Sequence, residues 1–209
     1  KNLVVLLTAS WSEYSGEAGQ PNFVRIVNEN LPNEVVPLVA HASPNGDPLY
    51  SLAASQFYEF YEAENFPELG LNTTAFEFRL EEWELATRAA AFEQVDGVTR
   101  PVQPKAMIAV SKKVVGKELY FKVRVRVEEV LTNMPLNLAV YVTENDIPAY
   151  QAGSANLYIN HQHVLRGAGT PGAWGVRLGE NDHAAGRVYE YEGRFPITQF
   201  MNSAKLFVN

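Results

Sequence analysis

Two serines three positions apart mark the place in this sequence where chemistry is most expected. They are Ser12 and Ser15, in the stretch LTASWSEYSG, which follows an apolar run and also contains Trp11 and Tyr14. The run reads as a buried strand that leads into a helix, and the free N–H groups of a helix start stabilise negative charge. Two cysteines placed there could exchange disulfides, because the helix start lowers the pKa of a thiol. A serine hydroxyl stays protonated near neutral pH and two hydroxyls form no reversible bridge, so we predict no disulfide exchange.

The same serines also fit two alternative roles. Serine is a favoured helix N-cap, so a purely structural role accounts for both. A nucleophilic serine is the second alternative, with His41 as the base and Asp47 as the residue that orients it. The sequence lacks the G-x-S-x-G motif of many serine hydrolases. We therefore expect a protein that is not an enzyme and that needs no cofactor.

A weaker candidate for chemistry is the pair His161 and His163. On an extended strand, residues two apart face the same way, so both imidazoles could ligate one metal ion. A third ligand such as Asp182 or His183 would be needed. The segment 160–166 also fits a strand with ordinary hydrogen-bonded histidines, and we assign no metal.

Composition and charge exclude several classes of protein. The chain has 209 residues, no cysteine and a formal net charge of −7, and a surface of that sign repels phosphate backbones, so nucleic acid is not an expected partner. Its apolar runs are far shorter than the ~20 residues that span a bilayer. The sequence begins at Lys1 on the threshold of a strand, so a targeting segment or a lipid-anchored cysteine would precede what is printed. We expect membrane association only through such an anchor.

The first half alternates strands and helices. Strands are expected at 3–8, 34–40 and 74–78, and helices at 16–30, 49–64 and 81–95. This order is typical of an α/β layer with a mainly parallel sheet. From Ala106 the apolar period becomes two, with Leu119, Phe121, Val123, Val125 and Val127 on one face, which predicts hairpin-linked antiparallel strands. Further strands are expected near 136–142, 187–191 and 205–208, around a glycine-rich loop at 167–179.

Short motifs add a resemblance to these patterns. The motifs occur in the order seen in a family of Bacteroidetes lipoproteins: WSEYSG, VAH followed by DP, FP with Asn72 shortly after, VYVTEND, Gln151 and HQHVLR. The chain resembles, over nearly its whole length, the 28-kilodalton outer-membrane protein family, whose members pair a thioredoxin-like domain with a β-domain. Many relatives look like W-C-x-Y-C at the positions of Ser12 and Ser15, and this sequence departs from them there.

The resemblance implies a fold and a location. The fold class is α/β plus all-β, with a thioredoxin-like N-terminal domain over residues 1–100 and an antiparallel β-sandwich domain over residues 101–209. The implied location is the outer membrane or cell surface, with a lipid anchor. Thioredoxin-like proteins carry a proline, usually cis, that faces the two cysteines, and Pro67 is placed for that role.

We interpret the whole as a redox-inactive scaffold that binds a protein, peptide or glycan at the cell envelope. Trp11, Ser12, Tyr14, Ser15 and Pro67 would be a degenerate redox site. A ligand groove beside it would be lined by Trp11, Tyr14, His41, Phe66 and Pro67, with backbone pairing of the kind that sheet edges support. One alternative is an envelope thiol-disulfide oxidoreductase whose two cysteines are replaced by serine in this chain. Another is a structural β-domain for surface assembly.

Overall fold

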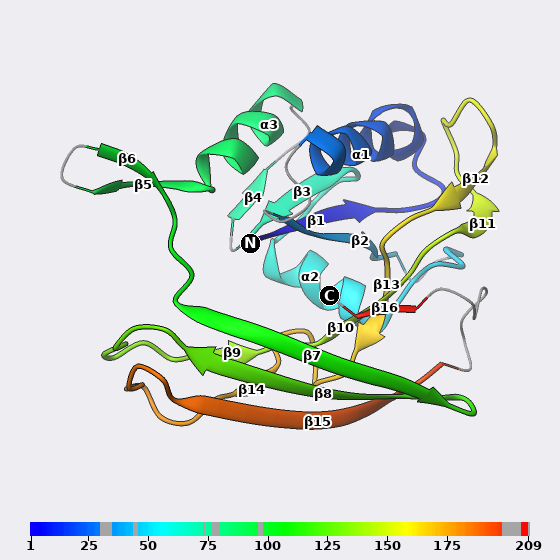
Figure 1. The fold of residues 1–209 in the computed structure, drawn as a ribbon. Coiled ribbons are helices and arrows are strands. Elements are labelled where there is room, and N and C mark those ends of the chain that lie inside the picture. Colours follow the sequence, from blue (N-terminus) through cyan, green and yellow to red (C-terminus); the bar gives the residue numbers. More distant parts are fainter. Residues whose placement is uncertain are drawn as a thin grey trace.

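A seven-stranded mixed sheet forms the centre of the molecule (Figure 1), in the order β16-β10-β13-β2-β1-β3-β4. The computed structural model describes residues 1–29, 35–43, 46–72, 74–76, 80–95, 98–197 and 206–208. The first half of the chain contributes β1 (Asn2–Thr8), β2 (Val35–His41), β3 (Glu68–Leu71) and β4 (Thr74–Phe76). The second half contributes β10 (Tyr141–Glu144), β13 (Val164–Ala168) and β16 (Leu206–Val208). The sheet thus crosses residue 100, and a domain boundary at that position stays a prediction.

The prediction of a mainly parallel sheet is wrong. Strand β1 runs parallel to β2, and β13 joins β2 in parallel at Val164 and Val39. The remaining neighbours are antiparallel: β3 to β1, β4 to β3, and both β13 and β16 to β10. Crossover helices are needed only between parallel strands, whereas β3 and β4 follow each other in the chain and pair antiparallel.

Helices cover both faces of this sheet (Figure 1). A π-helical turn, η1 (Ser15–Gly19), continues into α1 (Gln20–Glu29), and the chain also forms α2 (Leu52–Phe60) and α3 (Leu80–Ala89). Alternate side chains of β1 face opposite ways, so Val4 and Leu6 pack with residues of α1 and α3, whereas Val5 and Leu7 pack with residues of α2. Of the helices in the described ranges, none is long and apolar enough to cross a membrane.

Three local predictions need correction. Helix α2 begins later than predicted because the Ser51 side chain accepts a hydrogen bond from the Ala54 N–H and caps it. The helix expected over 81–95 ends at Ala89, and the chain then forms a hairpin of β5 (Phe92–Val95) and β6 (Val98–Pro101). Strand β3 was not predicted, although all four of its residues are buried. The predicted positions 30, 34, 77–78 and 205 lie outside the described residues.

The second half is β-rich, as predicted, but its strands divide among several sheets. Strands β7 (Ala106–Val115), β8 (Glu118–Val127) and β15 (Val188–Pro196) form a three-stranded antiparallel sheet in the order β15-β8-β7. The alternation predicted for β8 is confirmed, since its apolar face is buried against Leu138, Val140 and Leu178. Two small sheets pair β9 (Asn137–Leu138) with β14 (Val176–Arg177), and β11 (Ile147–Tyr150) with β12 (Tyr158–His161). Strands β10, β13 and β16 extend the central sheet rather than a separate sandwich.

Candidate functional site

The loop after β1 presents two aromatic side chains to solvent. Trp11 is 52% exposed and Tyr14 is 65% exposed, while Ser12 and Ser15 beneath them are buried. The loop is held by the Ser12 N–H, which donates to the Ala9 carbonyl at 3.1 Å. This part of the predicted site is thus a pair of exposed rings above two buried hydroxyls.

Ser12 joins this loop to the segment before β3. Its hydroxyl donates to the Phe66 carbonyl at 3.3 Å and accepts from the Ser15 N–H at 3.3 Å. The second contact is the one that a capping role predicts, because it occupies a free N–H of the helix start. The Ser15 hydroxyl is buried and has no hydrogen-bond partner among the described residues.

Phe66 completes the aromatic surface, and Pro67 does not. The Phe66–Pro67 bond is cis, as predicted. The rings of Trp11 and Phe66 meet edge to face, with centroids 5.8 Å apart and an interplanar angle of 76°. Pro67 is buried and lies so close to the helix start that a Cβ on Gly19 would come within 2.6 Å of it. We use "aromatic surface" below for Trp11, Tyr14 and Phe66.

His41 does not line a groove, which corrects the sequence-based prediction. Its side chain is fully buried, and its Nδ1 donates to Asp47 Oδ2 at 2.9 Å. The Asp47 carboxylate also accepts from the Ser10 N–H at 2.7 Å and the Leu49 N–H at 3.0 Å. Burial would raise the pKa of Asp47, but the hydrogen bond and charge of His41, with the two backbone amides, outweigh it and lower the pKa. His41 and Asp47 therefore stabilise the loop after β1 from the protein interior, through the Ser10 N–H.

The structure does not show the hydrogen bond between serine and histidine that the serine-hydrolase alternative requires. In a catalytic triad the nucleophile is hydrogen-bonded to the base. The Ser12 hydroxyl instead bonds to the Phe66 carbonyl and the Ser15 N–H. The His41 Nε2 is buried and has no hydrogen-bond partner in the described part of the chain. The geometry gives no activated serine.

The side-chain amides of Gln20 and Gln151 link the loop after β1 to the second half of the protein. Gln151 is fully buried, and its Nε2 lies 3.3 Å from the Ala9 carbonyl, 3.1 Å from that of Ser12 and 3.2 Å from that of Ala152. Three carbonyl neighbours identify that atom as the amide nitrogen, so Gln151 Oε1 must accept from Gln20 Nε2, 3.2 Å away. Because Gln20 presents its NH₂ group, His161 Nδ1, which lies 3.1 Å from Gln20 Nε2, must accept. The hydrogen-bond network therefore fixes His161 as the neutral tautomer with its proton on Nε2.

Burial reinforces this neutral state of His161. The ring is fully buried, its centroid 5.2 Å from that of His41. Burial, and then the charge of His41, lower the pKa of His161 to about 4, while Asp47 and the carbonyls of Ala149 and Tyr150 act in the opposite direction.

The paired-histidine geometry predicted for a metal site does not form. Strand β12 ends at His161 and β13 begins at Val164, and His163 between them has a φ of 55°. The two histidines therefore do not share one face of a strand. Of the two candidates for the third ligand, His183 bonds to the Tyr189 hydroxyl and the Met134 carbonyl, and Asp182 accepts from the Asn133 N–H. No cluster of three side chains suited to a metal occurs in the described residues.

Sequence reasoning missed the positioning residues of this site. Gln20 and Gln151 lie 131 positions apart, and Ser10 and Asp47 lie 37 apart. No local spacing connects residues so distant in sequence. The sequence indicated no role for Gln20 or Gln151, and Gln151 was noted only as part of the family resemblance.

Comparison with known proteins supports the fold rather than a family. No protein-family model matches the sequence, and neither does any curated protein. A solved structure, HBP35 of Porphyromonas gingivalis, is similar with a TM-score of 0.67 and 14% sequence identity. The similarity covers 100% of this chain and 67% of that one. This chain therefore shares its fold with a structure from the Bacteroidetes, the group to which the sequence motifs also point.

Proposed function

We propose that this chain is a redox-inactive, thioredoxin-like binding module that holds extended polypeptides on its aromatic surface. The observation that carries the proposal is the pair of exposed rings, Trp11 and Tyr14, beside Phe66 at a site where relatives of the resembled family carry cysteines. Exposed aromatic side chains supply most of the binding energy in many protein interfaces.

Topology supports the thioredoxin-like assignment. The order β2-β1-β3-β4, with β1 parallel to β2 and helices on both faces, places the loop after β1 opposite the segment before β3. The motif resemblance to the 28-kilodalton outer-membrane protein family favours a place in the cell envelope, and the similarity to HBP35 of Porphyromonas gingivalis supports the fold. We propose a lipid-anchored protein of the outer membrane or cell surface.

Redox inactivity follows from the residue types. The sequence contains no cysteine, so this chain has no thiol with which to exchange a disulfide. The Ser12 hydroxyl is engaged with the Phe66 carbonyl and the Ser15 N–H, which is a structural use of the position.

The geometry favours a polypeptide over a glycan. Sugar rings stack on flat, exposed aromatic faces, whereas the rings of Trp11 and Phe66 meet edge to face at 76° and do not form one flat platform. Exposed acidic residues, Glu13, Glu17 and Glu64, lie within a few positions of these aromatic residues in the sequence. With a formal net charge of −7, the chain should prefer basic partners.

The test uses an unfolded, basic, thiol-free polypeptide: hen lysozyme that has been reduced and carboxyamidomethylated. Fluorescence anisotropy of labelled lysozyme should show saturable binding to the full chain, and Trp11→Ala should weaken it at least about 10-fold, as for a hot-spot residue. Trp174→Ala is the matched control, since it removes an exposed tryptophan elsewhere. Equal losses in both variants, or absence of binding to the wild type, would contradict the proposal.

One observation favours the oxidoreductase alternative. The Ser15 N–H points at Ser12 Oγ, which is the contact that would stabilise a thiolate at position 12. Codons for cysteine at positions 12 and 15 of the native gene would establish this alternative, and serine codons would support the binding module.

A further inference from the structure

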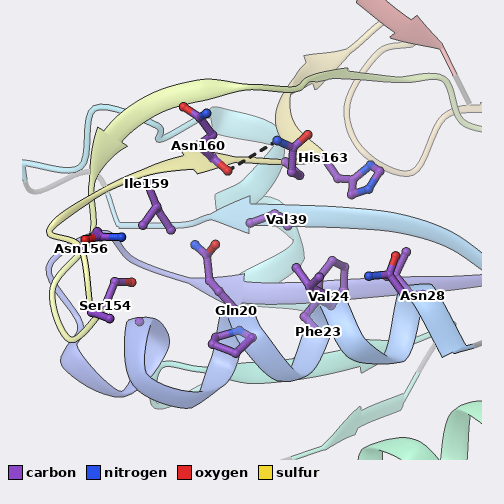
Figure 2. A pocket seen from close by; sticks show the side chains of 15 residues that line it. Gln20, Phe23, Val24, Asn28, Val39, Ser154, Asn156, Ile159, Asn160 and His163 are labelled. Atoms are coloured by element: carbon purple, nitrogen blue, oxygen red, sulfur yellow. Dashed lines mark hydrogen bonds between the residues drawn. The ribbon is translucent and has the colours of Figure 1, made fainter.

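A pocket of about 570 Å³ lies between α1 and the segment that contains β12 (Figure 2). Gln20, Val24 and Asn28 project into it from α1, and Ser154, Asn156 and Ile159 face them from the opposite side. Its volume is within the range of about 300–1,000 Å³ typical of ligand sites. Gln20, one of its lining residues, belongs to the buried hydrogen-bond network described above. The pocket plays no part in the proposed function.

The lining is uncharged. Five carboxamides surround an apolar floor that includes Phe23, Val27 and Val39; they are Gln20, Asn28, Asn156, Asn160 and Gln162. Among the described residues that line the pocket there is no Asp, Glu, Lys or Arg. Burial lowers the pKa of His163, so its ring is neutral at pH 7 as well. A charged ligand would lose part of its hydration here without gaining a counter-charge, which disfavours it relative to an uncharged ligand.

The arrangement of polar groups matches a peptide. A carboxamide carries the same donor and acceptor as a peptide unit, so Asn and Gln side chains can pair with both groups of a backbone amide. Strand β12, which supplies Ile159 and Asn160, has a strand neighbour on one side only within the described chain, β11. An unpaired strand edge is a common place for an extended peptide to bind. Among the described lining residues, Phe23 is the one Phe, Tyr or Trp; it is almost fully buried and offers no platform for a sugar.

We propose that this pocket binds a short uncharged peptide segment, with its backbone on the carboxamides and an apolar side chain against Val24 and Ile159. The walls are fixed before binding, which lowers the entropic loss of association. Gln20 is tied to Gln151 and His161, and a Cβ on Gly16 would come within 1.9 Å of the Ala152 carbonyl, so helix and opposite wall are in direct contact.

The test follows the side-chain NH₂ signals of Asn and Gln in ¹H–¹⁵N spectra of the full chain. The probe is the capped peptide acetyl-Ala-Val-Ala-amide. The ligand efficiency reached by good drug-sized ligands sets the tightest Kd to be expected from its ~20 non-hydrogen atoms at about 40 μM. The uncapped peptide, with charged ends, and the neutral saccharide maltotriose are the comparison ligands. We expect saturable shifts at Asn28, Asn156 and Asn160 with the capped peptide only.

Two variants make the test specific. Val24→Arg places a charged side chain in the pocket and should weaken peptide binding at least about 10-fold. Leu52→Arg, an exposed apolar position on α2, is the control and should leave it unchanged, with unaltered backbone signals showing that both variants fold. Three results would overturn the proposal: no saturation by about 10 mM capped peptide, equal or stronger binding of either comparison ligand, or unchanged binding to Val24→Arg. Because Trp11→Ala does not touch this pocket, failure of the proposed function and failure of this site are separately visible.

Discussion

Acidification should destabilise this protein through His161. Folding holds the pKa of this ring at about 4, compared with 6.5 for an unperturbed histidine. Between these values the unfolded chain binds a proton that the folded chain does not, so the free energy of unfolding rises with pH across this window. The stabilisation is complete above pH 6.5 and is lost as the pH falls toward 4.

The size of the effect follows from the same two values. One pKa unit corresponds to about 1.4 kcal/mol, so the full difference is about 3 kcal/mol, of which about 2 kcal/mol is already lost at pH 5. The structural cause is specific: a second proton on Nδ1 would face the NH₂ group of Gln20, beside the buried His41. Loss of the Asp47 contribution begins below its ordinary pKa of 3.8, so it falls outside this range.

Urea unfolding followed by tryptophan fluorescence at pH 7.5 and pH 5.0 measures this loss. His161→Gln should reduce the change between the two pH values by about 2 kcal/mol, because the replacement does not titrate. Comparing the change with pH cancels any uniform loss of stability in the variant. Burial also lowers the pKa of His163, so His163→Gln is the control that measures the contribution of this second histidine. A wild-type change below about 0.5 kcal/mol, or an unaltered change in His161→Gln, would rule out His161 as the group responsible.

Three further predictions concern the helix start, the loop after β1 and the edge of the three-stranded sheet. Gly16→Ala should lower the free energy of unfolding by about 1–3 kcal/mol, since the added Cβ meets the Ala152 carbonyl, and unchanged urea unfolding would be inconsistent with that contact. The double substitution Ser12→Cys and Ser15→Cys should give position 12 a thiol pKa below the usual ~8.5, measured from the pH dependence of alkylation by iodoacetamide. A pKa at or above that value would show that the Ser15 N–H does not act there. Ile108 is 63% exposed on the edge strand β7, so Ile108→Lys should slow aggregation on heating and change the free energy of unfolding by less than about 0.5 kcal/mol; an unchanged aggregation rate would exclude this edge as the cause.

The sequence patterns predicted the positions of several helices and strands better than the way the strands pair in sheets. The apolar run 3–7 and the alternation in 119–127 became β1 and β8, because burial on two faces or on one face leaves a direct trace in residue type. The end of α3 and the strand β3 were not predicted. Short segments of four residues carry little periodic signal, and Phe92–Val95 becomes a strand only through pairing with Val98–Pro101.

The site was predicted in part for the same reason. Trp11, Ser12 and Phe66 could be placed together, since a strand end and the segment before a neighbouring strand meet at one edge of a sheet. The inward position of His41 could not, because it depends on Asp47 and on Ser10, whose contact forms only in the folded loop. The same holds for Gln151, which reaches the loop from the second half of the chain.

Hydrogen–deuterium exchange of the full chain, with and without carboxyamidomethylated lysozyme, is the sharpest test of polypeptide binding at the aromatic surface. We predict slowed exchange of backbone amides at residues 10–16 and 64–68, around the aromatic surface, and no such slowing in Trp11→Ala. Protection confined to other segments, or equal protection in the variant, would contradict binding at this surface.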